Sequence, residues 1–188
     1  MVSKRNFDWD ILKSRYIVDD RWLRLRADTC RTPRGFVVEP YYVLEYPAWV
    51  AVVALSGDDR ILLVRQYRHG IGQTVLGLPC GNVEEKETAA EAARRELLEE
   101  TGYAAGVMVE TGRISPNPAN HSNLMHCFLA TDLNLAMAPA GDDDEEVEVV
   151  SRPVEEALTL IEKGEITQSL HISAILLALR KLDRVRCL

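Results

Sequence analysis

One segment of this 188-residue chain has clear signals both for the start and for the end of a helix. Thr88 is followed three residues later by Glu91, which is the spacing of a capping box, where each side chain accepts a hydrogen bond from the other residue's backbone N–H. Gly102 is a typical residue after a helix, because glycine adopts the left-handed conformation without steric cost. The sequence therefore predicts a helix from about Ala89 to Thr101.

The predicted helix has a concentration of acid on one side. With 100° between successive residues, a stripe of small and apolar residues can face a core, and Glu96, Glu99 and Glu100 fall on an adjoining arc. Like charges at this spacing repel and cost about 0.2 to 0.5 kcal/mol per pair. One explanation is a solvated face with arginines nearby. The other is a site for a hard divalent cation such as Mg²⁺, which prefers oxygen ligands and combines carboxylates with substrate phosphate.

The spacing around the helix favours the cation site. The segment consists of Gly81, five residues, Glu87, seven residues, and then Arg95-Glu96-Leu97-x-Glu99-Glu100-x-Gly102-Tyr103. It resembles the Nudix box of the Nudix hydrolases without a gap, with Tyr103 where an aliphatic residue is also common. The resemblance implies hydrolysis of a nucleoside diphosphate linked to another moiety, with Mg²⁺ or alternatively Mn²⁺ as the cofactor.

The same resemblance implies roles for individual residues. The implied metal ligands are Glu96, Glu99, Glu100 and the backbone carbonyl of Cys80. Glu87 and Arg95 match the ion pair that holds the loop to the helix. The thiol of Cys80 is not expected to be a nucleophile, because no motif for nucleophilic catalysis surrounds it.

The general base has two candidate positions. Glu99 is one of them. In ADP-ribose-type members of the family the base often lies in a mobile acidic loop after the box, and residues 142–146 of this chain are all acidic. Glu145 and Glu146 flank the start of a predicted strand, so the resemblance favours one of these two. A solvated run of charge is the alternative explanation for most of the five acids.

Two features in the body of the chain narrow the substrate class. Val64-Arg65-Gln66-Tyr67-Arg68 resembles the strand motif of ADP-ribose and related nucleotide-sugar pyrophosphatases. Arg68 would bind phosphate oxygens through its forked guanidinium, whereas Arg65 is expected to be structural. Pro118 lies where ADP-ribose pyrophosphatases also tend to have proline. The surrounding residues 115–122 depart from the usual loop of those enzymes, so a terminal sugar other than ribose stays open.

The first 46 residues are predicted to form a β-rich annex. Leu23, Leu25 and Ala27 alternate with charged residues, and Thr32-Pro33-Arg34-Gly35 predicts a turn. The annex resembles the dimerisation domain of this subgroup, in which one subunit helps to cover the active site of the other. Trp22 matches an aromatic position that stacks the nucleobase there, and Tyr41 or Tyr42 lies near a second one. Ordinary packing is the alternative for these aromatic residues.

Residues 47–188 are predicted to form the Nudix domain. Two apolar segments, 49–55 and 61–64, suit buried strands at the centre of a sheet. Ser151 as an N-cap predicts a helix that ends at Gly164, and a second helix is predicted over residues 168–182. The predicted fold class is thus α/β: a Nudix α/β/α sandwich with a mixed sheet, preceded by the small antiparallel annex.

Composition excludes several other classes of protein. Hydrophobic residues make up 47% of the chain and charged residues 27%, as in globular proteins, and no apolar run is long enough to span a bilayer. The N-terminal residues lack the apolar segment of a secretory leader, so a cytoplasmic protein without a membrane partner is expected. A net charge of -7 disfavours a nucleic-acid partner. The four cysteines form no CxxC pair and are expected to be reduced thiols.

The sequence leads to one main functional hypothesis. The chain is expected to be a homodimeric, metal-dependent pyrophosphatase that acts on ADP-ribose or a related nucleoside diphosphate sugar. Its products would be a nucleoside monophosphate and a sugar phosphate. Two alternatives remain open: a nucleoside triphosphate pyrophosphohydrolase and a non-catalytic Nudix-fold sensor of nucleotide sugars.

Overall fold

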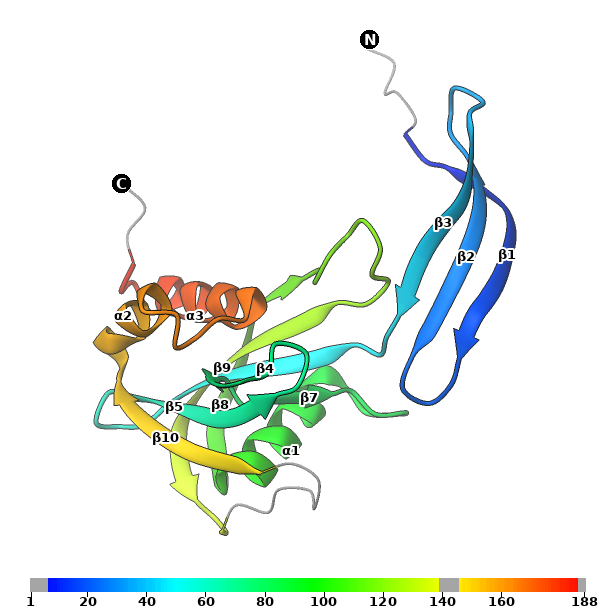
Figure 1. Ribbon diagram of the computed structural model, residues 1–188. Coiled ribbons are helices and arrows are strands. Elements are labelled where there is room, and N and C mark those ends of the chain that lie inside the picture. The colour runs from blue at the N-terminus through cyan, green and yellow to red at the C-terminus, as the bar shows by residue number, and fades with distance from the viewer. Residues whose placement is uncertain (1–6, 139–145, 186–188) are drawn as a thin grey trace. The chain divides into compact units, whose positions relative to one another are not determined.

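The computed structural model describes residues 7–138 and 146–185, and the chain divides into two compact units (Figure 1). The first unit comprises the described residues up to Pro47 together with Ser115–Asn123. The second comprises Ala48–Ile114 and the described residues from Leu124 onward. The predicted Glu145 and residues 142–144 lie outside the described residues.

The first unit contains a three-stranded antiparallel sheet in the order β1-β2-β3. Its strands are β1 (Asp10–Asp19), β2 (Arg24–Arg31) and β3 (Val37–Glu45). The predicted turn between β2 and β3 is confirmed: Gly35 has a φ of +85° and its N–H donates to the carbonyl of Thr32 at 2.9 Å. The segment 115–123 joins this unit through backbone hydrogen bonds, one of them from the N–H of Leu44 to the carbonyl of Asn120 at 2.7 Å.

The second unit is built on a mixed sheet with the strand order β10-β5-β4-β9-β8. Its strands are β4 (Trp49–Leu55), β5 (Arg60–Arg68), β6 (Gln73–Gly77), β7 (Cys80–Asn82), β8 (Tyr103–Ile114), β9 (Met125–Leu135) and β10 (Val147–Pro153). β4 pairs with β9 in parallel and with β5 and β7 antiparallel, while β6 extends β5. The strands predicted for residues 49–55 and 61–64 are thus confirmed as the central β4 and β5.

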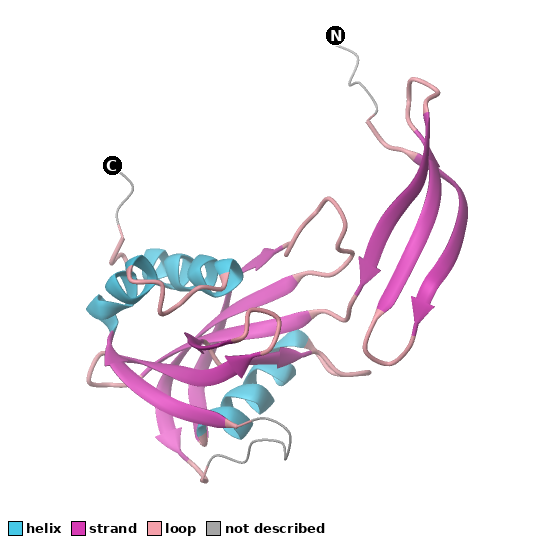
Figure 2. Ribbon diagram, in the orientation of Figure 1, coloured by secondary structure: helices cyan, strands magenta, loops and turns pink. Residues whose placement is uncertain are grey.

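Helices cover both faces of this sheet (Figure 2). They are α1 (Ala89–Thr101), α2 (Ala157–Glu162), which follows a short 3₁₀ turn, and α3 (Ser169–Lys181). Side chains of β4 alternate between two apolar clusters: Val50 and Val52 pack with residues of α1, whereas Ala51 and Val53 pack with residues of α2 and α3. This arrangement confirms the predicted α/β/α sandwich with a mixed sheet.

The predicted start of the helix after the acidic loop is wrong. Ser151 does not cap a helix. It lies within β10 opposite Leu62 of β5, and its Oγ accepts a hydrogen bond from Nε of Arg60 at 2.8 Å. The strand continues to Pro153, so α2 begins only at Ala157. Among the described residues, no helix combines the length and the apolar character that crossing a membrane would need.

Candidate active site

Helix α1 positions three of the predicted site residues, and local signals fix both of its ends. Oγ1 of Thr88 accepts from the N–H of Glu91 at 3.2 Å, and Oε2 of Glu91 accepts from the N–H of Thr88 at 2.8 Å. Gly102 ends the helix at a φ of +75°, with its N–H donating to the carbonyl of Leu98. The buried face of the helix packs on the sheet, which leaves Glu96 and Glu99 on another face.

Glu96 lies directly against the backbone of Gly81. A Cβ atom on Gly81 would be 1.9 Å from Oε1 of Glu96, which is far inside van der Waals contact. The close approach therefore requires glycine at this position. Only 13% of the Glu96 side chain is exposed, and burial raises the pKa of this carboxyl although Arg95 opposes the shift.

The guanidinium of Arg95 connects the loop before α1 to the acidic face of the helix. It donates to Glu87 through Nε at 2.9 Å and through Nη2 at 3.0 Å, and these hydrogen bonds lower the pKa of Glu87. Its Nη1 donates to Glu96 at 2.7 Å and to Glu99 at 3.1 Å. The predicted ion pair between Glu87 and Arg95 is thus present, and the same arginine also neutralises two of the predicted metal ligands.

Glu100 accepts a hydrogen bond from a different part of the chain than Glu96 and Glu99, which Arg95 holds. Its side chain is buried, and Oε2 accepts a hydrogen bond from the N–H of Cys80 at 3.1 Å. β7 therefore lies beside α1 with the backbone of Cys80 next to a carboxylate. Burial raises the pKa of the Cys80 thiol to about 12, so the thiol is protonated at neutral pH and is a poor nucleophile.

The donor set suits a hard divalent cation by its chemistry, since carboxylate and carbonyl oxygens are the ligands that Mg²⁺ prefers. In the conformation described, however, no three His, Cys, Asp or Glu side chains of residues 7–138 and 146–185 form a group that could hold a metal ion. In this conformation Arg95 donates hydrogen bonds to Glu96 and Glu99, whereas the N–H of Cys80 donates to Glu100. A cation held by all three carboxylates would require them to turn toward a common point.

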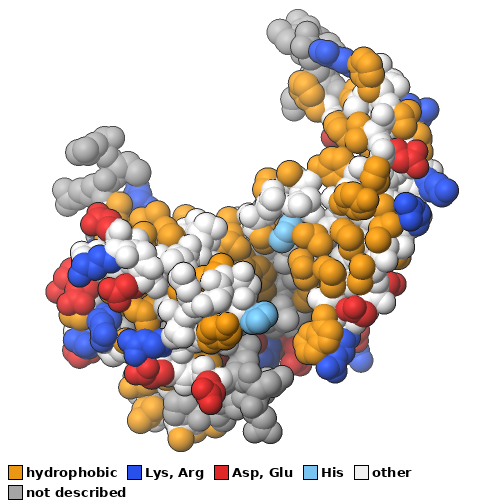
Figure 3. All heavy atoms as spheres, in the orientation of Figure 1, with side chains coloured by type: hydrophobic (Ala, Val, Ile, Leu, Met, Phe, Trp, Pro, Cys, Tyr) orange, Lys and Arg blue, Asp and Glu red, His pale blue; other side chains and the backbone are white. Residues whose placement is uncertain are grey.

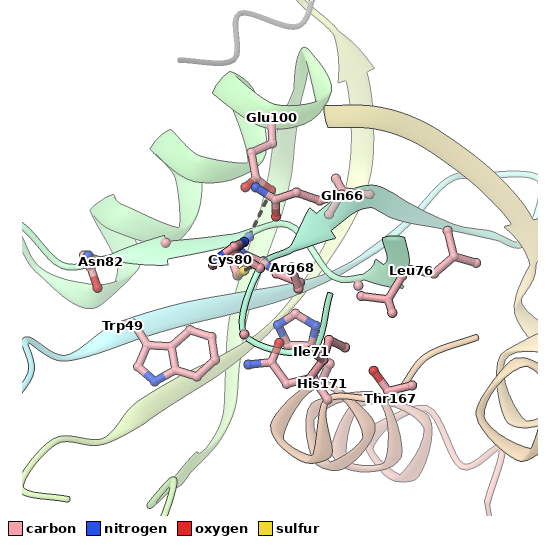
Figure 4. A pocket seen from close by; sticks show the side chains of 17 residues that line it. Trp49, Gln66, Arg68, Ile71, Leu76, Cys80, Asn82, Glu100, Thr167 and His171 are labelled. Carbon is pink, nitrogen blue, oxygen red and sulfur yellow. Dashed lines mark hydrogen bonds between the residues drawn. The ribbon is translucent and has the colours of Figure 1, made fainter. Parts of the chain in front are cut away.

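A cavity of about 640 Å³ lies in the second unit beside these residues (Figure 4). Its wall includes Trp49, Gln66, Arg68, Cys80, Glu100 and His171. Arg68 projects from β5 toward Cys80, whose Sγ lies 3.9 Å from Nη2 of the arginine. A partly buried cation therefore lines the same cavity as the carboxylate of Glu100.

Arg65, two residues earlier on β5, is not part of this cavity wall. It forms an ion pair with Glu148 of β10 at 2.6 Å, which links the two paired strands. Gln66, between the two arginines, is 7% exposed and lines the cavity; its Oε1 accepts no hydrogen bond from the described residues.

The remaining predicted site residues lie elsewhere. Trp22 is 71% exposed in the turn between β1 and β2, with the guanidinium of Arg21 4.1 Å from the ring centroid. The hydroxyl of Tyr41 donates to the carbonyl of Ala119, and Pro118 is exposed in the same loop. All three belong to the first unit, whereas the cavity is lined by residues of the second. Glu146 is exposed immediately before β10.

Most of the cavity wall is absent from the predicted site, including two ring-bearing residues, Trp49 and His171. His171 is 1% exposed on α3, and Trp49 begins β4, with the centroids of their rings 6.0 Å apart. One signal in the sequence could have indicated His171: it occupies the helical stripe that continues through Ala174, Ile175 and Ala178, and a histidine among such residues is either satisfied in a core or turned toward a site.

Comparisons with known proteins agree with this geometry. Residues 45–170 match the model of the NUDIX domain, and residues 9–44 match the nucleoside diphosphate sugar hydrolase N-terminal domain. An ADP-ribose pyrophosphatase of Bacillus subtilis (strain 168) is 34% identical over 125 residues, which are 66% of this chain and 68% of that protein.

Two further relatives cover most of the chain. A methanol dehydrogenase activator of Bacillus methanolicus is 29% identical over 170 residues, which are 90% of this chain and 91% of that protein. The crystal structure of an ADP compounds hydrolase superimposes with a TM-score of 0.85 and 26% identity, covering 97% of this chain and 100% of that chain. The likeness therefore includes the N-terminal strands as well as the mixed sheet.

Proposed function

Because the chain belongs to the Nudix family and is a Nudix hydrolase, we propose that it hydrolyses the pyrophosphate bond of ADP-ribose or of a related nucleoside diphosphate sugar. Water adds across the P–O–P linkage, which gives a nucleoside monophosphate, a sugar phosphate and a released proton. The matched nucleoside diphosphate sugar hydrolase N-terminal domain and the relative named ADP-ribose pyrophosphatase support this substrate class.

One observation carries the proposal: Glu100 and Arg68 line the same cavity. A pyrophosphate has to be held by positive charge, and the guanidinium of Arg68 can bind its oxygens in a forked geometry. Glu100 is buried at the same wall, where a carboxylate suits a divalent cation that would offset the remaining phosphate charge. The cavity volume of about 640 Å³ is in the range of ligand pockets.

Mg²⁺ is the cofactor that we propose, with Mn²⁺ as the alternative. Its proposed ligands are Glu96, Glu99, Glu100 and the backbone carbonyl of Cys80. When bound, such a cation neutralises phosphate oxygens and activates water. Gly81 contributes by leaving room for the carboxylate of Glu96, and Arg95 contributes by fixing the loop through Glu87.

The proton of the attacking water needs a carboxylate as general base. We propose Glu146 or Glu145 for this role, with Glu99 as the alternative. Glu146 is exposed before β10 and therefore accessible, and Glu99 has a side chain that is 47% exposed. Replacing both Glu145 and Glu146 by Gln should lower kcat at least about 100-fold, the contribution of a general base. Unchanged turnover in this double variant would assign the base to Glu99.

We also propose that the chain forms a homodimer through its N-terminal sheet. That sheet has a small core of its own and exposes large apolar side chains on its strands and turns; they include Trp9, Ile11, Ile17, Trp22 and Phe36 (Figure 3). Contiguous exposed apolar surface of this kind marks interaction sites. In the dimer, Trp22 and Tyr41 would stack the nucleobase and Pro118 would contact the substrate.

The proposal is tested by a panel of substrates in which a phosphomonoesterase liberates phosphate from the products. The panel contains ADP-ribose, UDP-glucose, GDP-mannose, NADH, a dinucleoside polyphosphate and a nucleoside triphosphate. We expect turnover of ADP-ribose or another nucleotide sugar to exceed that of the triphosphate. A preference for the triphosphate would favour a triphosphate pyrophosphohydrolase, and binding without turnover would indicate a sensor.

The variant Glu100→Gln tests the role of the buried carboxylate. We expect turnover to fall at least about 100-fold, because removal of one preorganised charge-stabilising group typically has this effect. The fold should survive, since the Gln side-chain oxygen can still accept from the N–H of Cys80. Glu85→Gln is the matched control, because Glu85 is exposed outside the cavity wall. Full activity of Glu100→Gln would remove this residue from the proposed metal site.

A further inference from the structure

His171 is a residue of the cavity wall to which the proposed reaction assigns no role. Its Nδ1 accepts a hydrogen bond from the N–H of Leu78 at 3.1 Å. An added Cβ on Gly77 would lie 2.9 Å from the same nitrogen, so the backbone passes close to the ring. The imidazole is thereby fixed between α3 and the segment that joins β6 to β7.

These contacts determine where the imidazole carries its proton. A nitrogen that accepts from a backbone N–H presents a lone pair, so the neutral ring has its hydrogen on Nε2. Burial lowers the pKa of His171 to about 3, and the nearby charge of Arg68 acts in the same direction. At neutral pH the residue is therefore an uncharged hydrogen-bond donor through Nε2.

That donor has no acceptor among the described residues. Nε2 is buried and makes no hydrogen bond within residues 7–138 and 146–185. Leaving a buried donor unsatisfied costs about 1 to 3 kcal/mol, and native proteins rarely retain such groups without a reason. Two occupants of the cavity can satisfy it: a trapped water or a bound ligand.

The position of His171 within the cavity indicates which part of a ligand it would meet. Glu100 contacts the backbone of Cys80, the Cys80 thiol contacts Arg68, and Arg68 is close enough to His171 to affect its pKa. Figure 4 shows the same sequence of side chains, with Arg68 and Cys80 between Glu100 and His171. A pyrophosphate held at Arg68 and Glu100 therefore has its neighbouring moiety near His171.

The chemistry of this end of the cavity suits a carbohydrate. Thr167 and Gln168 supply uncharged polar groups, and the half-buried ring of Trp49 supplies a flat apolar surface for the C–H face of a sugar. A neutral N–H donor matches an uncharged oxygen such as a hydroxyl, whereas phosphate oxygens are better matched by Arg68.

We propose that His171 is a substrate-binding residue whose Nε2–H donates a hydrogen bond to a hydroxyl of the sugar that leaves as the sugar phosphate. This inference rests on the proposed function, because it assumes a nucleoside diphosphate sugar in the cavity. It makes His171 a residue that distinguishes the sugar half of the substrate from the nucleoside half.

Two variants separate ligand binding from support of the fold. In His171→Asn, the side-chain oxygen occupies the place of Nδ1 and can still accept from Leu78, but the donor at Nε2 is lost. In His171→Gln, the amide reaches the place of Nε2 and restores a donor, while the acceptor for Leu78 is lost. The ligands are the two products of the best substrate in the panel, for ADP-ribose AMP and ribose 5-phosphate, with binding measured by calorimetry.

We expect His171→Asn to weaken binding of the sugar phosphate about 5- to 10-fold, the value of one hydrogen bond, and to leave binding of the nucleoside monophosphate unchanged. His171→Gln should recover most of the loss. In turnover, KM should rise by a similar factor with kcat little changed, because the bond exists in ground state and transition state alike.

Other results would overturn the inference. Equal weakening of both products would make His171 a residue that only positions the wall, and unchanged binding of both would indicate a trapped water. Weakening of the nucleoside monophosphate alone would place the nucleoside at this end. If wild-type protein hydrolyses no nucleotide sugar, the proposed function fails and this inference with it. If wild type is active and His171→Asn binds both products normally, only the inference fails.

A measurement on the wild-type protein covers the case in which a variant does not fold. Because Nε2 is buried, we expect its proton to exchange slowly enough with water to be observed by NMR in protein with ¹⁵N-labelled histidine. We expect its proton resonance to move downfield on addition of the sugar phosphate and to stay in place on addition of the nucleoside monophosphate. The opposite pattern, or no shift with either ligand, would contradict the proposal.

Discussion

At the scale of single residues, the contact between Gly81 and Glu96 makes the most direct prediction. In Gly81→Ala the new Cβ would overlap the carboxylate, so Glu96 has to move away from its place. A displacement of about 1 Å in a catalytic arrangement costs on the order of 100-fold in rate, and we expect a loss of kcat of this size. Gly57→Ala is the control, because its added Cβ would meet no atom within 4 Å. Activity of Gly81→Ala equal to that of the control would contradict the prediction.

The buried His171 also predicts a pH dependence of stability. Its pKa is about 3 in the folded protein and near 6.5 in the unfolded chain, so below pH 6.5 the unfolded state binds a proton that the folded state excludes. The titration of His171 leaves the free energy of unfolding unchanged above pH 6.5. As the pH falls from 6.5 toward 3, it lowers this free energy by up to about 1.4 kcal/mol per pH unit. Urea unfolding of wild type and His171→Gln between pH 7 and 5 measures it. We expect a smaller slope in the variant; identical slopes would show that His171 binds a proton equally well in the folded and the unfolded state.

At the scale of elements, the success of sequence-based prediction depended on how local the signals were. The bounds of α1 were predicted correctly as Ala89–Thr101, because Thr88, Glu91 and Gly102 determine them from within the segment. The bounds of the next helix were predicted incorrectly, because Ser151 has the chemistry of an N-cap but is held in β10 by Arg60, which lies 91 residues away in the chain. A partner at that distance leaves no mark in the local pattern.

The capping box of α1 predicts a measurable contribution to stability. Thr88→Ala removes the side-chain acceptor for the N–H of Glu91 and should lower the free energy of unfolding by about 1 kcal/mol. Thr88→Ser retains an oxygen at the same place and should restore most of this loss. Denaturant titrations of the three proteins provide the measurement, and equal stability of the alanine and serine variants would refute the contribution of the hydrogen bond.

At the scale of the whole molecule, the exposed apolar residues of the first unit predict self-association. Replacing both Ile11 and Ile17 by Asp should convert the proposed dimer into a monomer, because two charges would have to be buried in the interface. Lys163→Asp introduces a negative charge on an exposed site of the second unit and serves as control. Sedimentation equilibrium distinguishes the two states. A wild-type monomer, or a double variant that remains dimeric, would reject this interface.

The candidate site shows the same limit of sequence reasoning at the largest scale. The carboxylates of α1 could be found from the sequence because they lie within five residues of one another. Trp49, Gln66 and His171 come from β4, β5 and α3, and only the folded second unit brings them into one cavity wall. The roles of Trp22, Tyr41 and Pro118 stay predictions, since these residues belong to the first unit and none of them lines the cavity of the second.

The ion pairs of Arg95 have a consequence for the stability of the acidic helix. One guanidinium contacts Glu87, Glu96 and Glu99, so the mutual repulsion of these carboxylates is compensated by the protein's own charge. In the proposed metal site, a divalent cation would therefore compete with Arg95 for Glu96 and Glu99. The fold of this segment would then not depend on the cation that we propose for the reaction.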